Sequence, residues 1–375
     1  MATIGSTSAP STNTVYYDAL LSSTMDAFVG SGQLFDNVFK ESAFLSALRL
    51  NDAVIKQNGG ERIRAPLMYG SNSTVKGHRG YDLIDTTPQD GVSTAFYEWA
   101  EIAGSISISR REERQNSGEA AILNLLQAKL KQAEMTIREV LNTQLIQGSV
   151  SGTEYVPNVV DSLVKGMYPL GYFLRKDNTA NPAAGGNVGN ISAVSESWWR
   201  HKSAVADSAS VDTGNAFALS VSTYKGLSVA LKRLYNHCGR GSGGFPNLGV
   251  LDQNTFETYE NALDDKVRYT NTKMADMGFD SIKLRGATLI WDELVPGLDT
   301  GAVAGGSGFT GTAFLLNTNF YKLVIDSETD IITTPFVEPE NQTAKTAKIL
   351  FMGNAAVSNL RKQGVLYAIS QSIVS

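Results

Sequence analysis

Two glycine-rich stretches have the spacing that phosphate-binding loops use. Both match the pattern G-x-G-x-x-G, one at Gly239, Gly241 and Gly244 and the other at Gly306, Gly308 and Gly311. Such a loop holds a pyrophosphate where it leads from a strand into the N-terminus of a helix. The first stretch follows a predicted helix and the second runs into a predicted strand. We therefore interpret both as loops whose glycines provide conformational freedom.

A thiol and an imidazole stand side by side at His237 and Cys238, the only cysteine of the chain. A nucleophilic thiolate and its base normally meet through the fold, and neighbours on a helix point about 100° apart. We interpret the pair as a helix-end histidine beside a small buried thiol. The other two histidines, His78 and His201, lie far away, and no C-x-x-C or H-x-x-x-H spacing occurs. The sequence predicts no metal, no cofactor and no catalytic residues.

Paired carboxylates are the remaining candidates for acid–base chemistry. They occur at Asp264-Asp265 and at Asp292-Glu293. Adjacent carboxylates usually mark helix ends and turns, which is the interpretation we prefer. A hydrolase that uses these pairs stays open as an alternative from another functional class.

The charge and hydropathy of the chain argue against sequence-specific nucleic-acid binding and against a membrane-spanning helix. The chain has 375 residues, 32 basic and 37 acidic, and a net charge of −5. Basic residues gather only at Arg110, Arg111 and Arg114, where Glu112 and Glu113 neutralise them, so sequence-specific nucleic-acid binding is not expected. No apolar run approaches the roughly 20 residues that span a bilayer, and 42% hydrophobic residues can form a substantial core.

Periodicity predicts an α+β fold built around one long helix. Apolar residues at helical spacing predict an N-terminal helix over 34–50 and a long helix over 117–147. The stripe of the long helix is Ile122, Leu126, Leu130, Ala133, Ile137, Val140 and Leu141. Alternation predicts a strand over 63–69 and its return strand over 102–109. Further helices are predicted over 222–239 and 254–263, a hairpin over 282–291, and strands over 313–316, 348–352 and 365–369.

Two features lie outside these elements. Residues 70–91 form a polar, turn-rich excursion, and loops of that length are usually functional or disordered. Its charged residues are ordered by sign: Lys76, His78 and Arg79, then Asp82, Asp85 and Asp90. Trp198-Trp199-Arg200 is the second feature, and its large rings predict either core packing or an interface.

The order of these features resembles tailed-bacteriophage major capsid proteins with the Hong Kong 97-type capsid fold. The resemblance rests on Gly59-Gly60 with Arg64-Ala65-Pro66-Leu67, Trp198-Trp199-Arg200, Thr255 to Leu263, Ala275 to Phe279, Gly286 to Glu293, Asn359-Leu360-Arg361 and Gly364-Val365-Leu366. It implies an N-terminal arm and helix over 1–57 and an extended two-stranded loop over 58–110. It also implies a peripheral domain over 111–218 and 317–375, with a spine helix over 117–147, and an axial domain over 219–316.

The resemblance implies a structural subunit rather than an enzyme. Its members assemble into pentamers and hexamers of an icosahedral shell around double-stranded DNA, which is enclosed without sequence-specific binding. The implied partners are further copies of the chain, a scaffolding protein, a portal protein and, as a further candidate, a decoration protein. A separate scaffolding protein is expected because the region before Leu34 is shorter than the scaffold segment of some members. The implied location is the virion capsid, assembled in the bacterial cytoplasm.

The resemblance also assigns a role to the charged loop. An extended loop would lie across a neighbouring subunit, which makes Lys76, His78, Arg79, Asp82, Asp85 and Asp90 candidates for inter-subunit contacts. A surface loop without a partner is the alternative. An encapsulin-like protein compartment of the same fold remains an alternative for the whole chain.

Overall fold

The computed structural model describes residues 42–115, 125–147, 150–151, 154–155, 166–174, 187–205, 217–218, 224–263, 282–295, 310–339 and 343–370. Helices and mixed sheets alternate along the chain, so the predicted α+β class is confirmed. The described residues belong to two compact units. The larger is drawn from Ser42–Glu101, Leu141–Glu328 and Met352–Ser375, and the smaller from Ile102–Val140 and Thr329–Phe351.

A seven-stranded sheet organises the larger unit. Its order is β10 (Phe217–Ala218), β9 (Lys202–Val205), β18 (Gly364–Ser370), β14 (Thr310–Leu316), β11 (Leu248–Leu251), β13 (Ala287–Trp291) and β12 (Ile282–Leu284). The central strands are buried on both faces, which explains their continuous apolar runs. The predicted hairpin over 282–291 is confirmed, and Arg285 adopts a positive φ of 55° in its turn.

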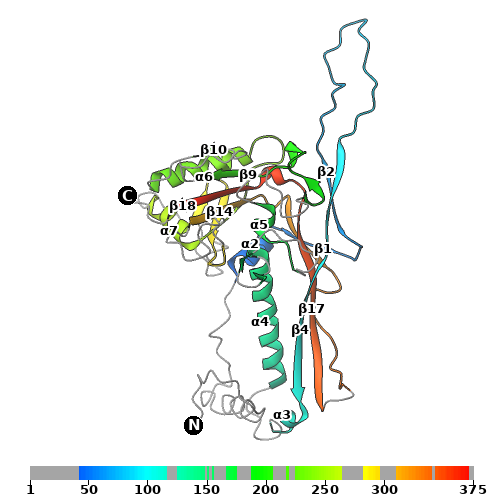
Figure 1. Ribbon diagram of the computed structural model, residues 1–375, viewed down its shortest axis with the longest axis vertical. Helices are drawn as coiled ribbons and strands as arrows, with labels where there is room; N and C mark the ends of the chain where they lie inside the picture. Colours follow the sequence, from blue (N-terminus) through cyan, green and yellow to red (C-terminus); the bar gives the residue numbers. More distant parts are fainter. Residues whose placement is uncertain are drawn as a thin grey trace. The chain divides into compact units, whose positions relative to one another are not determined.

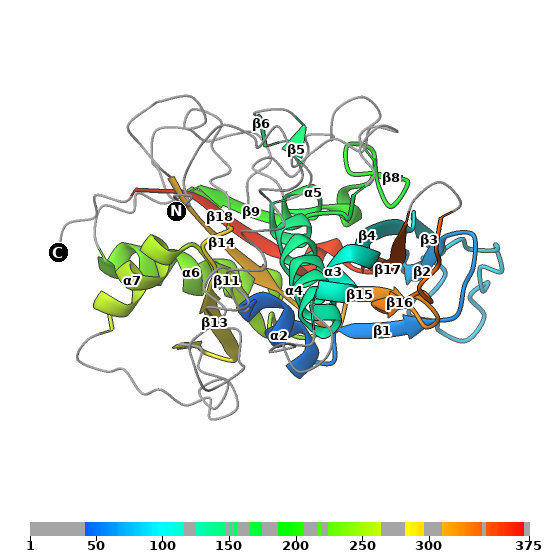
Figure 2. The same cartoon turned by 90° about the horizontal axis from the view of Figure 1, so that it is seen from below.

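Two helices pack on this sheet and were both predicted. α6 (Tyr224–Cys238) contacts β9 and β18, and α7 (Gln253–Asn261) contacts β13 and β14, as Figures 1 and 2 show. Leu227, Leu231 and Leu234 of α6 are fully buried because they recur on one helical face. The carboxylate of Asp252 caps α7 by accepting from the Thr255 N–H at 3.3 Å.

The same unit contains the start of the described chain. α2 (Ala43–Leu50) is capped by the Ser42 hydroxyl and ends at Leu50, as predicted; the predicted part before residue 42 lies outside the described residues. β1 (Val54–Gln57) then runs parallel to β15 (Tyr321–Asp326), which pairs antiparallel with β17 (Ala344–Val357). Gly59 N–H donates to the Asp326 carboxylate at 3.1 Å, which fixes the turn after β1.

The smaller unit holds most of β4 (Ala100–Ser109), α3 (Arg110–Gln115), β16 (Ile332–Thr333) and the first part of α4 (Leu125–Ile146). Its packing is close, since a Cβ added at Gly104 would lie 3.3 Å from Ile137 Cδ1. The buried Glu112 carboxylate accepts from Ser109 N–H and pairs with Lys129 Nζ at 3.1 Å. Glu112 therefore ties α3 to α4, a structural role for the mixed-charge cluster.

The long helix α4 agrees with the prediction at its end and differs on one face. It ends at Ile146, and the predicted start at residue 117 lies outside the described residues. Ile137, Leu141 and Leu145 are buried, whereas Val140 is 37% exposed. The predicted stripe was therefore wrong at Val140, because the buried face continues by steps of four residues. No helix in the described ranges is long and apolar enough to span a membrane.

The predicted pairing of the excursion was also wrong. β2 (Ile63–Met68) pairs antiparallel with β3 (Val92–Tyr97), from Ile63 opposite Tyr97 to Met68 opposite Val92. The strand expected to return, β4, pairs instead with β17. Both strands alternate in the same way, and alternation alone does not say which partner a strand takes.

Candidate functional site

The base of the β2–β3 hairpin is held by a buried tyrosine. Tyr97 is 1% exposed, and its hydroxyl donates to the Val357 carbonyl at 2.7 Å. Its ring makes edge contacts with Tyr168 and Phe173, at centroid distances of 6.0 Å and 5.9 Å. The hairpin is therefore anchored in the larger unit through its second strand.

A glycine lets a second segment approach that strand. Phe96 N–H donates to the Gly189 carbonyl at 3.0 Å. Gly189 has a φ of +60°, and a Cβ there would lie 2.8 Å from the Cβ of Ala95. Both the backbone conformation and the lack of space require glycine at this position.

The tryptophan pair divides between core and surface. Trp199 is buried, and its indole N–H donates to the Val188 carbonyl at 2.9 Å. Trp198 is partly exposed and stacks on Tyr69, with ring centroids 4.7 Å apart. Tyr69 directly follows β2, so Trp198 supports the last residue before the long loop. Core packing, one of the two predicted alternatives, therefore describes Trp199, and an interface at the partly exposed Trp198 stays a prediction.

Residues 70–91 form a closed loop whose ends touch. Tyr69 N–H donates to the Gly91 carbonyl at 2.9 Å, and a Cβ on Gly70 would lie 3.1 Å from Gly91 Cα. We call residues 70–91 the extended loop; Figure 1 shows it beyond β2. Hydrogen bonds inside it form local turns, such as Thr87 N–H to the Asp85 carboxylate at 3.1 Å, and one bond joins its two limbs, from the Ser73 hydroxyl to the Gln89 side-chain oxygen at 2.9 Å.

The six charged residues predicted as contacts are all exposed in the extended loop. They are Lys76, His78, Arg79, Asp82, Asp85 and Asp90. Within the described chain, none of them forms an ion pair with another charged side chain. The hydroxyl and N–H of Thr87 donate to the Asp85 carboxylate and lower its pKa, so this carboxylate stays charged. Their role as contacts between copies stays a prediction.

Large apolar side chains at the same loop were missed by the sequence analysis. Tyr81 and Leu83 are fully exposed, and Ile84 is 71% exposed. We call residues 81–85, which also include Asp82 and Asp85, the loop tip. Singly exposed apolar residues are common, whereas three within four positions form an exposed apolar cluster of the kind found at interaction surfaces. The signal was present in the sequence as Tyr81-x-Leu83-Ile84 inside an otherwise polar stretch.

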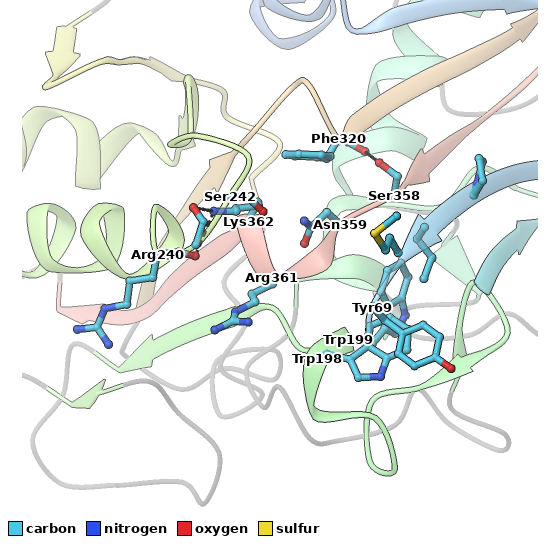
Figure 3. A pocket seen from close by; sticks show the side chains of 14 residues that line it. Tyr69, Trp198, Trp199, Arg240, Ser242, Phe320, Ser358, Asn359, Arg361 and Lys362 are labelled. Carbon is cyan, nitrogen blue, oxygen red and sulfur yellow. Dashed lines mark hydrogen bonds between the residues drawn. The ribbon is translucent and has the colours of Figure 1, made fainter. Parts of the chain in front are cut away.

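A cavity of about 420 Å³ opens next to the hairpin base, and Figure 3 shows its lining. Tyr69 and Trp198 lie together on one side, Arg240 and Arg361 lie on the other, and Phe320 lies near Lys362. We call it the cationic pocket. Its residues come from the end of β2, η2 (Ser197–Trp199), the loop after α6, the turn before β15, and η4 (Leu360–Lys362).

The first glycine-rich stretch forms part of this pocket. The Lys362 ammonium group is buried and donates to the carbonyls of Arg240, Gly241 and Gly244, at 3.1, 3.1 and 3.4 Å. Three glycines of this loop have a positive φ: Gly241 (88°), Gly243 (108°) and Gly244 (80°). The loop thus turns carbonyl oxygens toward a cation, whereas a phosphate loop presents N–H groups. Of the second stretch, only Gly311 lies within the described residues, at the start of β14.

The described acidic pair has a structural role. Asp292 is buried, and its carboxylate accepts from Leu294 N–H at 3.0 Å and from the Asn142 amide at 3.4 Å. Asn142 in turn accepts from the Ser42 hydroxyl at 2.6 Å. This chain of bonds joins β13 to α4 and to the N-cap of α2. Asp264-Asp265 lies outside the described residues.

His237 and Cys238 end α6 as predicted. Cys238 is fully buried, and burial raises the pKa of its thiol to about 12. His237 is partly buried, and burial followed by the nearby charge of Arg240 lowers its pKa. A thiol that stays protonated at neutral pH is a poor nucleophile. Among the described residues, no group of three or more His, Cys, Asp and Glu side chains could hold a metal ion.

The Cys238 thiol is expected to resist alkylation in the folded protein. With a pKa of about 12, roughly one thiol in ten thousand is ionised at pH 8. Because the pKa is raised, the reactivity of the folded protein should stay low until the pH approaches that value. Mass spectrometry after iodoacetamide treatment should show no adduct in native buffer and complete labelling in denaturant. Rapid labelling without unfolding would contradict the buried placement.

Comparisons with known proteins identify the fold. The chain is similar to a chain of the capsid asymmetric unit of cyanophage A-1(L), with a TM-score of 0.63 and 14% sequence identity. The match covers 91% of this chain and 96% of the cyanophage chain. The capsid of a native GTA particle matches over 91% of this chain and 96% of its own chain, with a TM-score of 0.52 and 12% sequence identity. The capsid of Myoviridae phage XM1 matches over 92% of this chain and 97% of its own chain, with a TM-score of 0.50 and 11% sequence identity.

These matches establish the class of fold. The chain has the Hong Kong 97-type capsid fold, as the resemblance implied. No family model and no curated protein sequence matches the chain. The likeness is therefore one of structure, at identities of 11 to 14%.

Proposed function

We propose that this protein is the major capsid protein of a tailed bacteriophage, a structural subunit that assembles with copies of itself into an icosahedral shell. The observation that carries the proposal is the capsid fold over 91% of the chain, shared with the cyanophage capsid subunit. The Asp292 carboxylate is engaged in structural hydrogen bonds and the Cys238 thiol is buried, which favours a structural protein over a hydrolase. In this proposal the subunits form pentamers and hexamers, and the shell encloses double-stranded DNA.

The proposed domains follow the resemblance. They are an arm and helix over 1–57, an extended two-stranded loop over 58–110, a peripheral domain over 111–218 and 317–375, and an axial domain over 219–316. A scaffolding protein, a portal protein and a decoration protein are the proposed partners, and the virion is the proposed location. Assembly takes place in the bacterial cytoplasm.

The exposed loop tip supplies the energy of a contact between copies. Burying a large apolar side chain contributes roughly 1.5–3 kcal/mol relative to leaving it in water. Tyr81 and Leu83 are fully exposed and Ile84 is 71% exposed, so a neighbour that covers them gains most of this amount. Exposed ion pairs contribute much less, and salt screens them. We therefore assign the loop charges to orientation and its apolar residues to affinity.

Electron microscopy of the purified full-length chain tests the proposed function. Closed shells with five-fold and six-fold rings are expected, alone or after co-expression with the scaffolding protein of its phage. Shells that contain a nuclease-protected genome support the phage capsid, and shells that contain a protein cargo support a cellular compartment. A monodisperse small oligomer under both conditions would contradict the proposal.

Polar substitution of the loop tip is expected to weaken assembly more than removal of two charges elsewhere in the extended loop. The variant Leu83→Ser with Ile84→Ser loses apolar area that only the assembled state buries, and the repeated interface multiplies the loss. The matched variant, Lys76→Gln with Asp90→Asn, changes two exposed charges and leaves the net charge unaltered. Light scattering at increasing protein concentration should show a higher assembly threshold for the first variant. An equal threshold for both variants would contradict the apolar contact.

A further inference from the structure

The cationic pocket gathers positive charge without neutralising carboxylates. Arg240 and Arg361 are exposed, and within the described chain neither guanidinium forms an ion pair. Burial lowers the pKa of Lys202 on the neighbouring strand β9, and the charges of Arg361 and Arg240 lower it further. Burial and then Arg361 likewise lower the pKa of Lys362. Mutually repelling cations cost stability, so a protein of net charge −5 keeps them most readily where a partner neutralises them.

The rest of the lining is aromatic, aliphatic and polar, and it includes Met68, Ser242 and Asn359. The stacked rings of Tyr69 and Trp198 form one side, and the ring of Phe320 lies apart from them, near Lys362 (Figure 3). A ligand that matches the whole pocket therefore carries negative charge and apolar surface together. The volume of about 420 Å³ is in the range of cavities that bind small ligands or a few side chains.

The loop tip has this combination of properties. Within five residues it carries two carboxylates, Asp82 and Asp85, and three exposed apolar side chains. Because Tyr81 and Leu83 are fully exposed, the chain's own surface does not cover the tip. The hydrogen bonds of Asp82 and Asp85 are made within the loop, to Arg79 N–H at 3.0 Å and to Thr87 N–H at 3.1 Å. The tip is thus presented as a formed turn.

We infer that the cationic pocket is the docking site for the loop tip of a second copy of this chain, with Asp82 and Asp85 facing Arg240 and Arg361 and the apolar side chains against Tyr69 and Trp198. The inference rests on the proposed function and adds the partner surface to it. The contact is head-to-tail, because the tip and the pocket are different surfaces of one subunit. Such contacts form a ring when the rotation from one copy to the next closes. A phosphodiester backbone is the other polyanion in the system, and it matches the cations but not the aromatic side.

Exchange of charge between the two surfaces tests the docking site. The pocket variant is Arg240→Glu with Arg361→Glu, the tip variant is Asp82→Lys with Asp85→Lys, and the exchanged variant carries all four changes. The control variant, Lys283→Glu with Lys348→Glu, changes the net charge by the same amount as the pocket variant at two exposed strand residues. All proteins are full-length. Circular dichroism and thermal unfolding establish that each one folds.

Shell yield by sedimentation and electron microscopy is the measurement. Like charges brought together should lower the yield of the pocket and tip variants at least about tenfold, and the exchanged variant should recover most of it. The control should assemble like the parent. Because salt screens repulsion as well as attraction, rising salt should increase assembly of the pocket and tip variants and decrease that of the parent.

Three results would overturn the docking site. The first is a pocket variant that assembles like the parent. The second is an exchanged variant whose shell yield stays as low as that of the pocket and tip variants. Normal shells of the pocket variant that retain less nucleic acid would assign the cations to the packaged genome instead. A parent chain that forms no shells under any condition contradicts the proposed function itself, which distinguishes the two failures.

Discussion

Replacement of residues 71–90 by a short Gly-Ser turn is expected to leave a soluble, cooperatively unfolding subunit that forms no stable shells. The subunit should fold because the ends of the extended loop already touch, with Tyr69 N–H bonded to the Gly91 carbonyl at 2.9 Å. The hairpin is also anchored elsewhere, through the buried ring of Tyr97 and its 2.7 Å hydrogen bond to Val357. The deleted residues contribute exposed side chains and local turns. Their loss removes the proposed contact between copies.

The matched control keeps the length of the loop. In it, residues 71–90 are replaced by 20 Gly and Ser residues, so the chain has the same contour without the tip. Both variants should unfold at temperatures close to that of the parent and should sediment as small species. Shells from the shortened chain that resist salt and heat as well as the parent would show that the loop does not connect subunits. Assembly restored by the Gly-Ser loop alone would assign the role to length and contradict the tip contact.

Ile137→Asp is expected to prevent folding, whereas Val140→Asp should be tolerated. Ile137 is 4% exposed and packs against β4 at Gly104, so the substitution buries an unpaired carboxylate at a cost of several kcal/mol. Val140, three residues further along α4, is 37% exposed. A carboxylate there remains hydrated, and the expected change in unfolding free energy is within about 1 kcal/mol.

Soluble yield and chemical denaturation of the two variants provide the measurement. Both replace a β-branched apolar residue by Asp on the same helix, so helix propensity and charge change alike. The difference in unfolding free energy between the two variants therefore measures the effect of burying the carboxylate. Equal stability of the two proteins would contradict the orientation of α4. A folded, assembling Ile137→Asp protein would contradict the placement of Ile137 in the core.

The sequence predicted elements wherever periodicity was unambiguous. α6 shows this, because Leu227, Leu231 and Leu234 recur at helical spacing and the chain breaks at Gly239. The 282–291 hairpin was equally clear from its two short apolar runs around Arg285-Gly286. Local signals of this kind depend on neighbours in sequence. They do not require knowledge of the rest of the fold.

The pairing of strands could not be predicted in the same way. The structure pairs β2 with β3, and Tyr97 of β3 bonds to the Val357 carbonyl, 260 residues away in sequence, a contact that no local pattern indicates. The exposure of Val140 has a similar origin, because the width of the buried stripe depends on what packs against α4. Side-chain periodicity describes a face of an element and leaves its partner undefined.

The sequence by itself determined the α+β class, the long helix, the charged loop over 70–91 and, through the order of these features, the resemblance to capsid proteins. Only the tertiary structure showed that Tyr81, Leu83 and Ile84 are uncovered, and that Arg240, Arg361 and Lys362 line one pocket with Tyr69 and Trp198. These residues are up to 293 positions apart, as Tyr69 and Lys362 are. The exposure of a side chain and the charges near it depend on all the segments that surround it in the folded protein. They become defined only when distant segments are brought together.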